Sequence, residues 1–311
     1  MTTQEHTETV APPSLESSFT IKDAYAYCER ITRHHYENFP VASFLLPKEK
    51  RPYIYSIYAF ARGADDVADE GNIPADERIA HLAQWQQHLD QCYKGNASHP
   101  VFVALGRTVR DLEIPKSYFT ALLAAFRQDV IKSRYETFEE LIEYCSNSAN
   151  PVGRLVLHVF GYRDENFYRY SDFLCTALQL TNFWQDVEID LAKNRIYIPL
   201  EDMDRFDYYE GELIAKRATP EYKRLVQLQV ERTRALFRAG YQITRLVGKE
   251  LRSELRLTWF GGMKILEKVE AMDYDVFGRR PRLHLWDLPG LFLHAFSKRT
   301  PRMKRRTIYV S

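Results

Sequence analysis

The sequence has few cysteines, few chain breakers and no long apolar run, and each shortage excludes a class of protein. Its four cysteines are scattered without a Cys-x-x-Cys spacing, so we expect no zinc site and no disulfide framework, and a reducing cytoplasm fits best. It has no run of about 18 apolar residues and no signal-peptide layout, so we expect a chain that is neither membrane-spanning nor secreted. Only 13 glycines and 14 prolines punctuate 311 residues, fewer than strand-and-turn architectures need, which favours a mainly helical protein.

The chain also lacks an excess of either charge. It has 43 basic and 42 acidic side chains, so the formal net charge is +1 and a nucleic-acid partner is not expected. Apolar residues make up 45% and charged residues 27%, which is an ordinary composition for a folded, soluble protein.

Three regions follow from composition and periodicity. Residues 1–17 are polar and contain a Pro-Pro pair, which predicts a disordered tail. From residue 18 to 296 apolar residues recur at helical spacing between proline and glycine breakers, which predicts a single all-α domain of long helices joined by short connections. Residues 297–311 form a basic tail.

One stretch of helical periodicity contains a proline. In Glu139 to Phe160 the Asn150-Pro151-x-Gly153 step removes a helical donor and crowds the preceding turn. The pattern predicts either a kink beside a ligand cavity or a plain break between two helices, and the sequence leaves both open.

Two acidic helix faces carry the strongest signal. Tyr58, Arg62, Asp65 and Asp69 are offset by 0, 4, 7 and 11 residues, which places them within about 60° of one helix face. A second set, at offsets 0, 3, 7 and 11, also shares a face and consists of Gln179, Asn182, Asp186 and Asp190.

Paired carboxylates of this kind indicate a metal site when both helices are packed inside. A single Asp-x-x-x-Asp pair on an exposed helix is ordinarily structural, but four carboxylates about 6 Å apart repel by roughly 3 kcal/mol per pair at an effective dielectric near 20. Oxygen ligands without cysteine or paired histidine select a hard ion such as Mg²⁺. We therefore expect a Mg²⁺ cluster that helps diphosphate leave a substrate. The 14% aromatic content would supply ring faces that stabilise the carbocation formed when diphosphate leaves.

Seven motifs in order resemble one family. The residues that carry the resemblance are Asn38-Phe39 before Leu45-Leu46-Pro47, IYAFARGADDVAD (57–69), SRYETFEELIEYC (133–145), NPVGR (150–154), LQLTNFWQDVEID (178–190), NRIYIP (194–199) and YDVFGRRP (274–281). From about residue 20 to 280 the chain resembles trans-isoprenyl diphosphate synthases of the squalene/phytoene synthase type. The resemblance implies an all-α, single-domain helical array of the isoprenoid synthase type around a central cavity.

The same resemblance implies roles for individual residues. It implies that Asp65, Asp69, Asp186 and Asp190 bind a cluster of two to three Mg²⁺ ions. It implies catalytic roles for Tyr58, Arg62, Tyr144 and Asn182. It implies that the substrate is contacted by Asn38, Phe39, Gln179, Gln185, Tyr274, Arg279 and Arg280.

Within this family the motif sequences are similar to those of the hydroxysqualene synthase of the hopanoid branch. Gln185 stands where the condensing members of the family have an arginine. An enzyme that ionises presqualene diphosphate holds one diphosphate instead of two, so the loss of one cation at this position fits that reaction. The expected reaction is ionisation of presqualene diphosphate, rearrangement and a water quench to hydroxysqualene. A synthase that condenses two allylic diphosphates to presqualene diphosphate, squalene or phytoene is the nearest alternative. A second alternative is a catalytically silent assembly subunit. The four intact aspartates disfavour it, because an inactive protein has no reason to keep four buried carboxylates.

The expected cofactors and partners follow from this interpretation. NADPH is not expected, because no glycine-rich dinucleotide fingerprint follows a strand. The resemblance implies a prenyl diphosphate substrate and, as partners, a presqualene diphosphate synthase and a flavin-dependent reductase. Residues 298–306 hold six cations after the apolar stretch 291–296, which predicts either a solvated tail or peripheral attachment to anionic lipid at the inner face of the membrane.

Overall fold

Apolar residues spaced three and four apart form one face of nearly every helix in the computed structural model, which describes residues 19–34, 46–69 and 73–297. The helices are α1 (Ile21–His34), α3 (Arg51–Asp69), α4 (Ala75–Lys94), α5 (Pro100–Leu112), α6 (Lys116–Ile131), α7 (Phe138–Ser148), α8 (Asn150–Val159), α9 (Glu165–Gln185), α10 (Val187–Ala192), α11 (Leu200–Arg205), α12 (Glu210–Ile214), α13 (Pro220–Gly240), α14 (Ile243–Leu246), α15 (Lys249–Ala271), the 3-10 turn η2 (Leu285–Asp287) and α16 (Leu288–Phe296). The described residues contain no strand, and none of their helices is long and apolar enough to cross a membrane. The expected all-α fold is confirmed.

Helix starts follow the local signals in the sequence. Thr137 caps α7 by accepting a hydrogen bond from the Glu140 N–H at 3.1 Å, and Asp164 caps α9 by accepting one from the Asn166 N–H at 2.8 Å. Proline stands in the first turn of α5, α8 and α13, where its missing N–H costs nothing.

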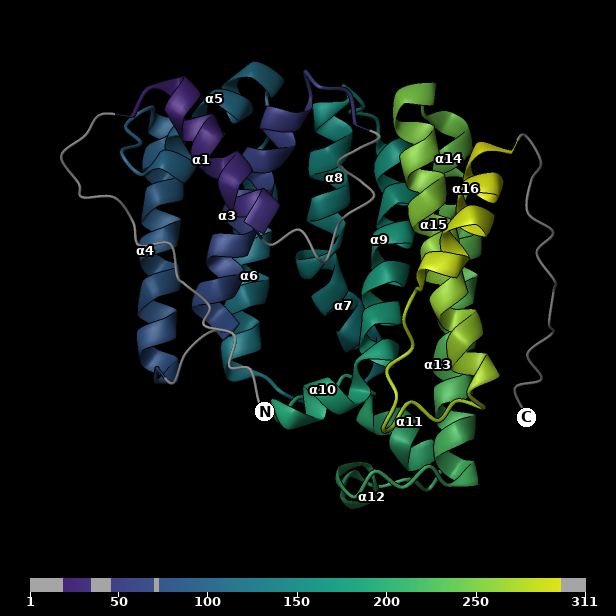
Figure 1. Ribbon diagram of the computed structural model, residues 1–311. Helices are drawn as coiled ribbons and strands as arrows, with labels where there is room; N and C mark the ends of the chain where they lie inside the picture. Colours follow the sequence, from purple (N-terminus) through teal and green to yellow (C-terminus); the bar gives the residue numbers. More distant parts are fainter. Residues whose placement is uncertain (1–18, 35–45, 70–72, 298–311) are drawn as a thin grey trace, which may run out of the picture.

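The interior contains two large apolar clusters joined by shared helices. The first is built on α1, α3, α4, α5 and α6, with Phe60, Phe102 and Phe119 fully buried. The second is built on α7, α9, α13 and α15, with Trp184 and Phe237 among its buried side chains. Helix α8 packs against both α3 and α9, so it lies between the two clusters, as Figure 1 shows.

The proline-containing stretch forms two helices. α7 ends at Ser148 and α8 begins at Asn150, with Ala149 at φ −113° and ψ −45° between them. Of the two structures that the sequence left open, the break is therefore the one that forms. Gly153 lets α8 approach α9 closely, because a Cβ at this position would lie 2.3 Å from Oγ of Ser171.

The C-terminal ends of α3, α6 and α9 lie at the same end of the helical array, next to α10 (Figure 1). Two connecting loops are tied together there by backbone hydrogen bonds. The Ile196 N–H donates to the Ser133 carbonyl at 2.9 Å, and the Leu200 N–H donates to the Tyr135 carbonyl at 2.9 Å. These bonds place the 194–199 motif beside the 133–145 motif.

Candidate active site

The C-terminal half of α3 carries the first predicted group. Tyr58, Arg62 and Asp65 share one side of this helix, and the Arg62 guanidinium reaches two carboxylates. Its Nη1 lies 3.1 Å from Oδ2 of Asp65, and its Nη2 lies 2.5 Å from Oδ1 of Asp66. Burial raises the pKa of Tyr58, so the phenol stays protonated at neutral pH. Asp69 is the last residue of α3, and its side chain lies outside the described part of the chain.

The second predicted group does not occupy one continuous helix, and this corrects the sequence interpretation. α9 ends at Gln185 and α10 begins at Val187, because Asp186 has φ −109° and ψ 15°. Aspartate favours such positions because its short carboxylate competes with the helix for nearby backbone groups. The backbone still turns in the same sense, since the Asp190 N–H donates to the Asp186 carbonyl at 2.9 Å. Asn182 stays on α9, whereas Asp190 lies on α10.

A segment from the C-terminal region, residues 278–281, lies across the α9–α10 junction. Arg280 forms a two-pronged ion pair with Asp186, in which Nη2 lies 2.7 Å from Oδ2. The side-chain amide of Gln185 donates to the Pro281 carbonyl at 2.5 Å. The Gly278 N–H donates to Oε2 of Glu188 at 2.8 Å. Tertiary folding thus brings two motifs together that are 94 residues apart in the sequence.

The remaining residues that were predicted to contact substrate differ in how exposed they are. Gln179 is half-buried on α9, and Asn182 is exposed one turn before Asp186. Tyr274 is buried with a left-handed backbone (φ 60°), and Arg279 is exposed. The predicted residues Asn38 and Phe39 lie outside the described residues, as do the tail 1–17 and all but the first residue of the tail 297–311.

Tyr144 lies in an aromatic cluster that the sequence did not predict as a unit. Its hydroxyl donates to Oδ1 of Asp129 at 2.7 Å, and burial raises its pKa well above the ordinary value. The ring of Phe183 stacks on that of Tyr197 with centroids 3.7 Å apart, and Tyr144 lies 6.1 Å from Tyr197. Asp129 was missed because one carboxylate in an apolar helix has no distinguishing spacing. The structure gives it a role as the acceptor for a buried phenol.

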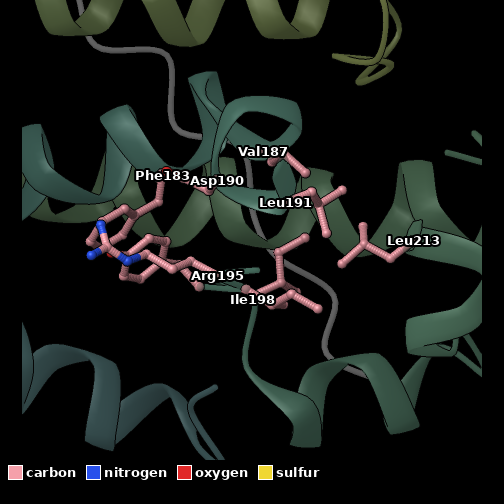
Figure 2. A pocket seen from close by; sticks show the side chains of 9 residues that line it. Phe183, Val187, Asp190, Leu191, Arg195, Ile198 and Leu213 are labelled. Carbon is pink, nitrogen blue, oxygen red and sulfur yellow. The ribbon is translucent and has the colours of Figure 1, made fainter. Parts of the chain in front are cut away.

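A small pocket lies beside this cluster, between α9, α10 and the 194–199 motif (Figure 2). Its empty volume is about 220 Å³, part of it open to solvent, and Phe183, Asp190 and Arg195 contribute to its wall. Figure 2 shows the Arg195 guanidinium toward the Phe183 side, with Leu191 and Leu213 away from it. The pocket therefore combines one carboxylate and one guanidinium with an aromatic and aliphatic wall.

Two of the four predicted carboxylates pair with arginines of the same chain. Arg62 pairs with Asp65, and Arg280 pairs with Asp186, so each arginine offsets part of the repulsion expected from the acidic pattern. Across the described residues, no group of three or more histidine, cysteine, aspartate or glutamate side chains lies close enough together to hold a metal. Magnesium is typically held by one or two carboxylates together with substrate phosphates, and oxygen-only donors suit that arrangement.

The chain is similar in sequence and in fold to several known proteins. A family model described as squalene/phytoene synthase matches residues 32–287. A 15-cis-phytoene synthase of Synechocystis sp. is 30% identical over 280 residues, covering 86% of this chain and 83% of the relative. A hydroxysqualene synthase of Zymomonas mobilis is 38% identical over 208 residues, covering 66% of this chain and 69% of the relative. A crystal structure described as squalene synthase HpnC from Alicyclobacillus acidocaldarius has a TM-score of 0.80 at 40% identity, covering 83% of this chain and 97% of that one.

Proposed function

The chain belongs to the squalene/phytoene synthase family, and from that premise we propose that it converts presqualene diphosphate and water to hydroxysqualene and diphosphate. In this reaction the carbon–oxygen bond to diphosphate breaks, the cyclopropylcarbinyl cation rearranges, and water supplies the hydroxyl group and releases a proton. Two hydroxysqualene synthases among the relatives, at 38% and 35% identity, support the proposal, and a phytoene synthase of Mycobacterium tuberculosis at 37% identity supports the condensing alternative equally.

The observation that carries the proposal is the neutral side chain at position 185. The Gln185 side-chain amide donates to the Pro281 carbonyl, so it holds the 278–281 segment in place. Because it is neutral, it adds no positive charge beside Asp186. A site for one diphosphate needs fewer cations than a site for two. Arg62 and Arg280 lie against two of the predicted metal carboxylates, and the planar guanidinium of each suits pairing with phosphate oxygens.

We infer that Asp65, Asp69, Asp186 and Asp190 hold magnesium when the diphosphate substrate is bound. Magnesium there would neutralise charge on the departing diphosphate. The chain's own residues supply the rest of the chemistry. The stacked rings of Phe183 and Tyr197 present π faces that stabilise a carbocation, and burial excludes water from the Tyr144 phenol.

A condensing synthase remains the second candidate function, since the Synechocystis phytoene synthase matches 86% of the chain and the HpnC structure is described as a squalene synthase. Such an enzyme would join two allylic diphosphates, with the same aspartates holding magnesium. The two candidates differ in the substrate they accept.

The test is incubation of the purified protein with Mg²⁺ and either presqualene, farnesyl or geranylgeranyl diphosphate, without nicotinamide, followed by mass spectrometry. We expect hydroxysqualene from presqualene diphosphate, a hydroxyl oxygen derived from labelled water, and loss of activity with chelator or with Asp65→Asn or Asp186→Asn. Asp204→Asn is the matched control, because it makes the same change at an exposed carboxylate of α11 that lies outside the predicted metal set. Efficient condensation of farnesyl or geranylgeranyl diphosphate would instead establish the second candidate.

A further inference from the structure

Asp129 stands where the energetics of its own helix disfavour a carboxylate. It lies two residues before the end of α6, at the negative end of the helix dipole, where a basic residue would be favourable. Aspartate is also among the weaker helix formers. A residue that opposes the local preferences of its helix is expected to have a role that the tertiary structure sets.

The tertiary contact of Asp129 is with Tyr144 of α7. The Tyr144 hydroxyl donates to Oδ1 of Asp129 at 2.7 Å, and Tyr144 is only 4% exposed. A hydrogen bond to a carboxylate is roughly twice as strong as one between neutral groups. The bond therefore fixes the orientation of the buried hydroxyl and directs its proton toward α6.

Other contacts hold the carboxylate in place. Helix α6 packs against α7, and the Arg195 guanidinium donates to the backbone carbonyl of Asp129 at 3.2 Å. Arg195 belongs to the same 194–199 motif as Tyr197, whose ring stacks on Phe183. The position of Asp129 relative to the aromatic cluster is therefore set by two segments other than its own helix.

Tyr144 connects the carboxylate to the rings beside the pocket. Its ring centroid lies 6.2 Å from that of Phe183 and 6.1 Å from that of Tyr197, and both of these residues line the pocket. Burial and, next, the Asp129 charge raise the pKa of Tyr144, so the phenol keeps its proton at neutral pH. A phenol that donates to a carboxylate is polarised, which increases the electron density of its oxygen and ring and their attraction for a cation.

We propose that Asp129 is a positioning residue for Tyr144 in the reaction. By accepting the phenolic proton, it holds Tyr144 in the orientation in which the oxygen and the polarised ring stabilise the carbocation that forms when diphosphate leaves. No covalent bond forms to either residue. The inference rests on the proposed function, which supplies the carbocation, and it applies equally to the condensing candidate, which also forms one.

The kinetic test uses the full chain with Mg²⁺ and compares Asp129→Leu, which removes the acceptor, with Asp129→Asn, which keeps an acceptor oxygen in the same shape. In Asp129→Leu, kcat and kcat/KM should fall together by about tenfold, because the lost interaction is made in the transition state. Asp129→Asn should recover most of this loss. If circular dichroism shows that the leucine variant is unfolded, Asp129→Glu takes its place. Equal losses in the asparagine and acceptor-free variants would overturn the proposal.

A double-mutant cycle tests whether Asp129 acts through Tyr144. On the Tyr144→Phe background, Asp129→Leu should cause no further loss of kcat, because the hydroxyl that it positions is gone. Tyr93→Phe is the control background, since the Tyr93 hydroxyl donates to the Ile114 carbonyl at 2.9 Å beside the other apolar cluster. There the loss caused by Asp129→Leu should be unchanged. A full loss on the Tyr144→Phe background, or a Tyr144→Phe variant with unaltered kcat, would contradict the proposal.

NMR of the tyrosine side chains needs no substrate and therefore separates this proposal from the proposed function. In protein labelled with ¹³C at tyrosine Cζ, the signal that is missing from Tyr144→Phe identifies Tyr144. This signal should shift in Asp129→Leu, which removes the carboxylate that polarises the phenol, and should stay in place in Asp204→Asn. An unshifted signal in Asp129→Leu would overturn the positioning role. If the unaltered chain leaves presqualene diphosphate unconsumed, the proposed function alone fails, and the kinetic variants are compared on the allylic diphosphate that the chain condenses.

Discussion

Glu254 is a buried carboxyl group in α15 that makes stability depend on pH. The residue is 7% exposed, and its Oε2 has no hydrogen-bond partner among the described residues. Burial raises the pKa of Glu254 from 4.5 to about 7, because the ionised form loses its hydration. The folded protein therefore keeps the proton on Glu254 at pH values where the unfolded chain releases it.

The sign and size of the effect follow from the two pKa values. Below pH 4.5 the group is protonated in both states and costs nothing. As the pH rises from 4.5 to about 7 the unfolded chain ionises first, so the free energy of unfolding falls, and above about 7 the loss is complete. A difference of about 2.5 pKa units corresponds to roughly 3 kcal/mol, a large part of a typical stability of about 5–15 kcal/mol.

The test is urea unfolding of the unaltered chain and of Glu254→Gln between pH 5 and 8. Glutamine has nearly the same shape and does not titrate, so the stability of the unaltered chain relative to the variant should fall by about 2–3 kcal/mol across this range. Glu250→Gln changes an exposed carboxylate on the same helix and should leave the pH dependence unchanged. A difference between the unaltered chain and Glu254→Gln that stays constant with pH would refute the reasoning, whatever its absolute size.

Two further predictions concern packing and the α9–α10 junction. Gly153→Ala should lower the melting temperature, because the new methyl group would lie 2.3 Å from Oγ of Ser171 and overpacking costs about 1–3 kcal/mol, whereas Gly211→Ala, where no neighbour lies within 4 Å, should not. Equal melting temperatures for these two variants would contradict the close packing of α8 on α9. Arg280→Gln should reduce turnover of presqualene diphosphate more than Arg279→Gln, because the Arg280 guanidinium forms a two-pronged ion pair with Asp186. Equal rates for the two arginine variants would remove Arg280 from the site.

The ends of the helices and the residues on each acidic face could be predicted locally. Thr137, Asp164 and the proline-led first turns are signals that act within a few residues, so they need no tertiary context. The alignment of Tyr58, Arg62 and Asp65 likewise depends on helical periodicity alone. The break at Asp186 escaped this reasoning, since the apolar pattern continues across it and a single residue sets the backbone dihedral angles.

Contacts between distant segments required the tertiary structure. The pairing of Arg280 with Asp186, the hydrogen bond from the Gln185 side-chain amide to the Pro281 carbonyl and the hydrogen bond from Tyr144 to Asp129 join residues with no common period or motif. The sequence by itself determined the all-α architecture, the acidic residue types and the family, because these depend on short-range spacing and on the order of motifs. Only the tertiary structure decided that Arg280 neutralises Asp186, because that pairing depends on how segments far apart in the chain come to lie side by side.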